Sequence, residues 1–161
     1  MPRSFTVSSD LATHADTLWQ HAVTPLDINA EFRPLLSMSF PDGMDDITAG
    51  WQPGCHRFRS WIKLGGLLPV DYDDMALAEV EPGSHFYEVS SLASQAVWEH
   101  RRAIAALPGG ARLTDSVSFT SRIAWLEPLY EWVFRWVFLW RHHNLRRMYG
   151  NRFATSAKDE Q

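Results

Sequence analysis

The stretch that decides the fold, residues 126–150, reads LEPLYEWVFRWVFLWRHHNLRRMYG and contains no helix breaker after Pro128. A proline at that place suits the first turn of a helix, so the pattern predicts one long helix of about six to seven turns. Its apolar side chains cover a very wide arc: Leu126, Leu129, Tyr130, Val133, Phe134, Trp136, Val137, Trp140, Leu145 and Met148. The polar side chains form a narrow stripe: Glu131, Arg135, His142 and Arg146. A helix this apolar needs a partner that wraps around it, and a curved sheet can do so.

The chain before that helix predicts such a sheet. Breakers at Gly65-Gly66, Pro82-Gly83 and Pro108-Gly109-Gly110 separate five stretches with strand-like patterns: residues 56–64, 70–80, 85–92, 96–107 and 112–122. Connections this short indicate an antiparallel meander. Upstream, we expect a first strand at residues 5–7 and short helices at residues 13–23 and 29–33, the first ended by Pro25 and the second by Pro34.

The predicted fold class is therefore α+β. A curved antiparallel sheet is expected to wrap around the long C-terminal helix, and two short helices follow the first strand. The chain of 161 residues fits a single domain, which we place at residues 1–153, followed by a disordered tail at residues 154–161.

Composition and charge argue against several classes of function. The formal net charge of −4 argues against a nucleic-acid partner, because phosphate binding needs a basic surface. Cys55 is the only cysteine, so no internal disulfide is expected and a reducing cytoplasm is the predicted compartment. The most apolar window, residues 129–140, is shorter than the ~20 residues that span a bilayer, so no transmembrane segment is expected. The arginines near the C-terminus are interpreted as cations that offset the dipole of the long helix: Arg141, Arg146, Arg147 and Arg152.

No metal site and no cofactor are predicted. Adjacent residues on a helix point about 100° apart, so His142 and His143 are interpreted as an exposed helix end. The acidic residues Asp71, Asp73 and Asp74 lack the spacing of a calcium-binding loop and are interpreted as solvated turns.

Short motifs between residues 75 and 119 sharpen this picture. They are MALAEVEPG at residues 75–83, His85-Phe86, WEHRR at residues 98–102, Pro108-Gly109-Gly110 and LTDSVSF at residues 113–119. Together with the order of the elements, they resemble the SRPBCC group, the ligand-binding relatives of START domains, Bet v 1 and polyketide cyclases. The resemblance covers the chain from about residue 5 to residue 152. It implies a helix-grip fold with a cavity for a small molecule between the sheet and the C-terminal helix.

Strand alternation places polar residues among the apolar ones on the inner face of the sheet. His100, Arg102 and Asp115 share the parity of the inward apolar positions, so they are candidates for orienting a ligand. The full set of candidate ligand-binding residues is Phe58, Ile62, Trp98, His100, Arg102, Asp115, Val117, Phe119, Tyr130, Phe134 and Val137.

The hairpin closed by residues 107–110 predicts a register. It sets Arg102 opposite Asp115 and His100 opposite Val117, with both charges projecting into the cavity. A register shifted by two residues would set His100 opposite Asp115 instead, so Asp115 has a partner in either case.

Three hypotheses of function follow. The first is a carrier or sensor that binds a hydrophobic small molecule in the cavity. The second is an enzyme similar to polyketide cyclases or aromatases, in which His100 and Asp115 assist proton transfer through a positioned water. The third is a protein-interaction module with a filled core. Pairing of two copies as a homodimer stays open.

Overall fold

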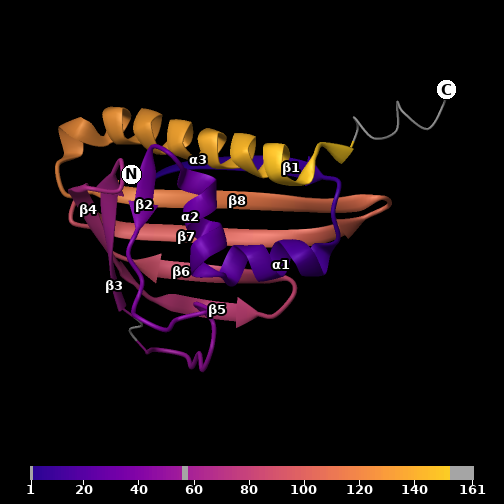
Figure 1. Ribbon diagram of the computed structural model, residues 1–161. Coiled ribbons are helices and arrows are strands. Elements are labelled where there is room, and N and C mark those ends of the chain that lie inside the picture. The colour runs from indigo at the N-terminus through magenta and orange to yellow at the C-terminus, as the bar shows by residue number, and fades with distance from the viewer. Residues whose placement is uncertain (1, 56–57, 153–161) are drawn as a thin grey trace.

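Five antiparallel strands form the main sheet of the protein, whose computed structural model describes residues 2–55 and 58–152. The order in the sheet is β1-β8-β7-β6-β5 (Figure 1). The strands are β1 (Arg3–Leu11), β5 (Leu77–Glu81), β6 (His85–Ser90), β7 (Gln95–Leu107) and β8 (Gly110–Ser121). The long helix α3 (Glu127–Tyr149) lies along the sheet (Figure 1). The predicted α+β helix-grip architecture is therefore confirmed, and the predicted tail lies outside the described residues.

A smaller sheet of three strands continues the main one. It consists of β2 (Leu36–Met38), β3 (Phe58–Leu64) and β4 (Leu68–Met75), in the order β2-β3-β4. The strand predicted at residues 70–80 is divided at Ala76, and the halves β4 and β5 belong to different sheets. An isolated antiparallel β-bridge between Asp73 and Leu92 keeps β4 beside the end of β6. The two sheets therefore form one curved surface. Strand β2 has only three residues and was not predicted from the sequence.

Proline and glycine set the ends of the helices. Helix α1 (Ala15–Val23) is followed after one residue by α2 (Pro25–Phe32). Pro25 begins α2 as well as ending α1, because a proline in the first turn of a helix lacks only an N–H that would have no partner there. A short 3-10 turn, η1 (Ala124–Leu126), leads into α3, and Gly150 ends α3 with a φ of 77° that suits glycine.

The predicted register of the β7–β8 hairpin is confirmed. Arg102 pairs with Asp115, His100 with Val117 and Ile104 with Leu113. Even-numbered residues of β7 from 98 to 104 and odd-numbered residues of β8 from 111 to 121 are buried, which is the predicted inner face.

The prediction that the whole apolar arc of α3 would be covered is wrong. Within that arc, Leu129 is 53% exposed, and Trp136 and Met148 are also exposed. The helix lies on the inner face of the sheet, and no element among the described residues packs against its opposite side. No described helix is long and apolar enough to cross a membrane.

Two expectations about the polar residues of α3 are also wrong. His142 is fully buried rather than exposed at a helix end, and Arg141 is 5% exposed rather than a solvated cation that offsets the helix dipole. The reason is that α3 stays packed on the sheet and α2 well beyond these residues, since Leu145 is fully buried as well.

Candidate functional site

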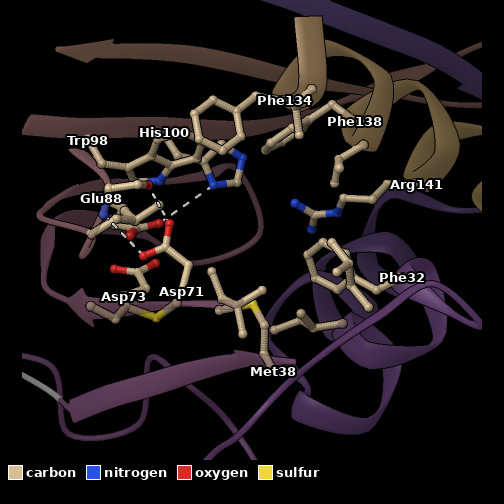
Figure 2. Close-up of a pocket in the computed structure, with 18 of the residues that line it drawn as sticks. Phe32, Met38, Asp71, Asp73, Glu88, Trp98, His100, Phe134, Phe138 and Arg141 are labelled. Carbon is tan, nitrogen blue, oxygen red and sulfur yellow. Dashed lines mark hydrogen bonds and ion pairs between the residues drawn. The ribbon is translucent and has the colours of Figure 1, made fainter. Parts of the chain in front are cut away.

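A cavity of about 330 Å³ lies between the inner face of the main sheet, the helices α2 and α3, and the strands β3 and β4. Its wall is largely apolar and rich in aromatic rings, among them Phe32, Trp98 and Phe134 (Figure 2). Leu129 of α3 and Val70 of β4 belong to the wall, yet they are 53% and 54% exposed. The cavity therefore opens to solvent between α3 and β4.

The structure divides the candidate ligand-binding residues into two sets. Six of them line the cavity: Ile62, Trp98, His100, Tyr130, Phe134 and Val137. The other five lie in the protein interior outside the cavity wall: Phe58, Arg102, Asp115, Val117 and Phe119. In the hypothesis of a His100–Asp115 acid–base pair, only His100 therefore reaches the cavity.

Arg102 is the centre of a buried ionic network that lies behind the cavity. Its Nη1 and Nη2 donate to the two carboxylate oxygens of Glu31 at 2.6 and 2.8 Å. Its Nε and Nη2 donate to the two oxygens of Asp115, each at 2.8 Å. One guanidinium, 1% exposed, thus bridges two fully buried carboxylates from α2 and β8.

Two histidines complete the partners of Asp115. His100 Nε2 lies 2.7 Å from Oδ1, and His142 Nε2 lies 2.9 Å from Oδ2. Because Nε2 of His142 donates its hydrogen to Asp115, Nδ1 of the same ring can accept a hydrogen bond from the Ser9 hydroxyl, which lies 2.8 Å away. Burial alone would raise the pKa of Asp115, but the charge and hydrogen bonds of Arg102 and the hydrogen bonds of both histidines hold it well below its usual range. Asp115 is thus an ionised structural anchor.

A second polar group, from β4, β6 and β7, does line the cavity. Asp73, Glu88 and His100 lie together on one side of it, beside Asp71 (Figure 2). The Ser90 hydroxyl lies 2.9 Å from Asp73 Oδ1 and 2.6 Å from Glu88 Oε1, and His100 Nδ1 lies 3.6 Å from Glu88 Oε2. Asp71 accepts hydrogen bonds from the backbone N–H and the hydroxyl of Ser94.

The charges in this group are unequal. Burial and the charge of Glu88 raise the pKa of Asp73 well above its usual value. Burial also opposes the charged forms of Glu88 and His100. The hydrogen bond and charge of His100 nevertheless lower the pKa of Glu88. The hydrogen bonds and charges of Asp115 and Glu88 raise the pKa of His100. The cavity wall therefore favours the protonated form of Asp73 and the charged forms of Glu88 and His100.

The interpretation of Asp73 as a residue of a solvated turn is wrong. Asp73 lies within β4 and is 4% exposed. It shares the strand parity of Met75, which is also buried, so the alternation rule that identified His100 on β7 could have found it. The dense run of aspartates concealed that alternation.

Arg141 of α3 is a polar residue of the cavity wall on the side opposite Asp73 and Glu88 (Figure 2). Its Nε donates to Glu31 Oε2 at 2.8 Å, and its guanidinium carbon lies 4.5 Å from the ring centre of Phe32 and 4.8 Å from that of Phe138. Arg141 was not among the predicted ligand-binding residues. It lies one helical turn beyond Val137 and two turns beyond Phe134, so the helical period could have placed it on the cavity face.

We expect Asp73→Asn to change how stability depends on pH. Because the folded pKa is raised above the unfolded value of about 3.9, the proton on Asp73 stabilises the fold fully below that value. This stabilisation is lost as the pH rises through the folded pKa. The variant does not lose this stabilisation. Between the unfolded value and the folded pKa, its free energy of unfolding should therefore rise relative to that of the wild type by up to about 1.4 kcal/mol per pH unit.

Urea unfolding at a series of pH values measures this difference. Asp42→Asn, at an exposed turn, is the control for removing one carboxylate. A constant difference between Asp73→Asn and the wild type from pH 4 to pH 8 would show that Asp73 is not held neutral.

Proteins of known structure share this fold at low sequence identity. Protein CV1439 from Chromobacterium violaceum is 10% identical with a TM-score of 0.69, over 91% of this chain and 97% of that one. The Zhui aromatase/cyclase from Streptomyces sp. R1128 is 10% identical with a TM-score of 0.65, over 92% of this chain and 96% of that one. Major latex-like protein 151 from Panax ginseng is 5% identical with a TM-score of 0.64, over 92% and 97%.

These similarities show the fold that the sequence motifs implied, the helix-grip fold of the SRPBCC group. No curated protein sequence matches the chain. Residues 9–149 match the family described as a domain of unknown function, DUF8410. Since that match spans most of the chain, the protein belongs to the DUF8410 family.

Proposed function

We propose that this domain binds an apolar small molecule in the cavity between the main sheet and α3, as a carrier or sensor. The observation that carries the proposal is an open cavity of about 330 Å³ whose wall is mostly apolar and aromatic. This volume falls within the range of about 300–1,000 Å³ that is usual for small-molecule sites. In a protein-interaction module with a filled core, side chains would occupy this space.

The few polar groups of the wall support a ligand with a polar end. Asp73, Glu88 and His100 lie on one side of the cavity and Arg141 on the other (Figure 2). Polar groups placed sparsely in an apolar wall fix the orientation of a ligand, while the apolar surface supplies most of the affinity.

Titration with the neutral fluorescent probe N-phenyl-1-naphthylamine tests the proposal. We expect saturable binding, and we expect Val137→Phe to weaken it by about ten- to a hundredfold, because the larger ring overfills the wall. Val97→Phe is the matched control: Val97 is 42% exposed and does not belong to the cavity wall. Native mass spectrometry of protein from its own host should show a mass excess of a few hundred daltons.

No saturable probe binding, together with ligand-free protein from the host, would contradict the proposal. Equal weakening by Val137→Phe and Val97→Phe would place the probe outside the cavity.

A second candidate function is acid–base catalysis of the cyclase type. It is favoured by Asp73, whose raised pKa favours the protonated acid beside Glu88 in the cavity wall, because a proton donor and a carboxylate acceptor then face the same ligand. A structural neighbour is named an aromatase/cyclase. Genes for polyketide synthesis beside this one, and turnover of a polyketide that Asp73→Asn abolishes without loss of binding, would support it.

A further inference from the structure

Arg141 is a buried cation whose counter-charge is shared. Its side chain is 6% exposed, and both its Nε and its Nη2 lie 2.8 Å from a single oxygen of Glu31, Oε2. The same Glu31 also accepts both Nη1 and Nη2 of Arg102. Among the described residues, none accepts a hydrogen bond from Nη1 of Arg141, and the guanidinium extends toward the interior of the cavity (Figure 2).

The two arginines of the network differ in how well their charges are balanced. Arg102 contacts two carboxylates, and they raise its pKa despite complete burial. Burial and the nearby charge of Arg102 lower the pKa of Arg141, and Glu31 does not offset them. The cavity side of Arg141 is therefore a place where one further negative charge would be stabilised.

We propose that Arg141 binds the carboxylate of an apolar carboxylic acid in the cavity, and that this head group defines the ligand class. The inference rests on the proposed function of the cavity and adds the chemistry of its ligand. A guanidinium suits a carboxylate because it offers several N–H donors in one plane. Phe32 and Phe138 hold that plane in position through contacts at 4.5 and 4.8 Å from their ring centres.

The other side of the cavity fixes the direction in which such a ligand lies. Glu88, whose lowered pKa favours the carboxylate, lies there, so a second carboxylate beside it would be repelled. The apolar body of the ligand would instead extend from Arg141 along the rings of Phe134 and Trp98, whose centres are 5.0 Å apart.

A matched pair of probes tests the head group in the wild-type protein. Isothermal titration compares 4-phenylbutanoate with 4-phenylbutan-1-ol at neutral pH. We expect the carboxylate to bind about ten- to a hundredfold more tightly, as a hydrogen bond to a charged group supplies. Arg141→Met should reduce this ratio to near one, and Arg135→Met, on the exposed side of the same helix, should leave it unchanged.

Each other result counts against the proposal. Equal affinity of the wild type for the two probes would overturn it and leave the proposed function intact, because the cavity would still bind apolar molecules. A preference that survives in Arg141→Met would assign the carboxylate to another group. If neither probe and no neutral fluorescent probe binds, the proposed function itself fails and the inference fails with it.

A second measurement uses only the wild-type protein, so it tests the proposal even where Arg141→Met does not fold. The side-chain Nε–H resonance of Arg141 in labelled wild-type protein should shift more on addition of the carboxylate than of the alcohol. Equal shifts would overturn the proposal.

Discussion

Replacing Asp115 with alanine is expected to lower the free energy of unfolding by about 3–5 kcal/mol. The substitution leaves Arg102 with one carboxylate instead of two, and it removes the acceptor of both His100 and His142. All of these groups are buried, so water cannot take the place of the lost carboxylate without disrupting the packing. Asp10→Ala is the matched control, because Asp10 makes a similar two-point ion pair with Arg112 at the surface. Its loss should be far smaller.

The pH dependence of the Asp115 substitution provides a second check. The folded pKa of Asp115 is depressed, so its contribution to stability is complete above the unfolded value of about 3.9. That contribution declines only as the pH falls from there through the folded pKa. The difference between wild type and variant should therefore shrink in strong acid. It should also fall as the pH rises above the unfolded histidine value of about 6.5, because Asp115 helps to raise the pKa of His100.

A double-mutant cycle separates the pair from its surroundings. Arg102→Met alone leaves both Glu31 and Asp115 without the cation that they share. In the double variant with Asp115→Ala, only Glu31 has lost that cation. We expect the double variant to lose clearly less stability than the sum of the single losses. Strict additivity would mean that Arg102 and Asp115 do not stabilise each other.

The part of this network on β7 and β8 could be predicted from the sequence. Arg102 and Asp115 lie on a hairpin whose short turn fixes the register, and strand alternation fixes the face. Local rules were sufficient there, because the two residues are only 13 positions apart and joined by one turn.

The rest depends on contacts between distant segments. Glu31 is 71 residues from Arg102 and 110 from Arg141, and no periodic pattern links a carboxylate on a short helix to either of them. His142 looked like part of a polar stripe on α3, because its acceptor Asp115 becomes its neighbour only after the helix docks on the sheet. Both cases contradict the simple rule that charged residues of a helix face solvent.

The cavity shows the same division. The aromatic side of its wall, from Trp98 to Phe134, followed from the faces of β7 and α3. The side formed by Phe32 and Met38 did not, since α2 and β2 are too short for their periodicity to identify an inner face.

Glu31→Ala should have an effect as large as that of Asp115→Ala, a loss of about 3–5 kcal/mol in the free energy of unfolding. Glu31 is fully buried and accepts from Arg102 and Arg141, and its Oε1 lies 3.0 Å from His21 Nε2. Burial would raise the pKa of this carboxyl, but the charges of the two arginines hold it well below its usual range, so the ionised form is the one that stabilises the fold.

Glu79→Ala is the matched control for Glu31→Ala. Glu79 also contacts two partners, His85 at 2.8 Å and Arg101 at 3.1 Å, but its side chain is 50% exposed. Chemical denaturation should show almost no change for that variant, since exposed ion pairs contribute little. Similar losses for Glu31→Ala and Glu79→Ala would mean that burial does not determine the strength of the network.

The Glu31 variant also connects the stability of the network to the ligand. Once Glu31 is removed, Arg141 has lost its carboxylate on the protein side while its guanidinium still extends toward the cavity (Figure 2). A bound carboxylate would then supply the missing charge, so 4-phenylbutanoate should raise the melting temperature of Glu31→Ala more than that of the wild type. The alcohol 4-phenylbutan-1-ol should raise both to the same small extent. A carboxylate that stabilises the wild type and Glu31→Ala equally would show that the ligand and Glu31 do not share Arg141.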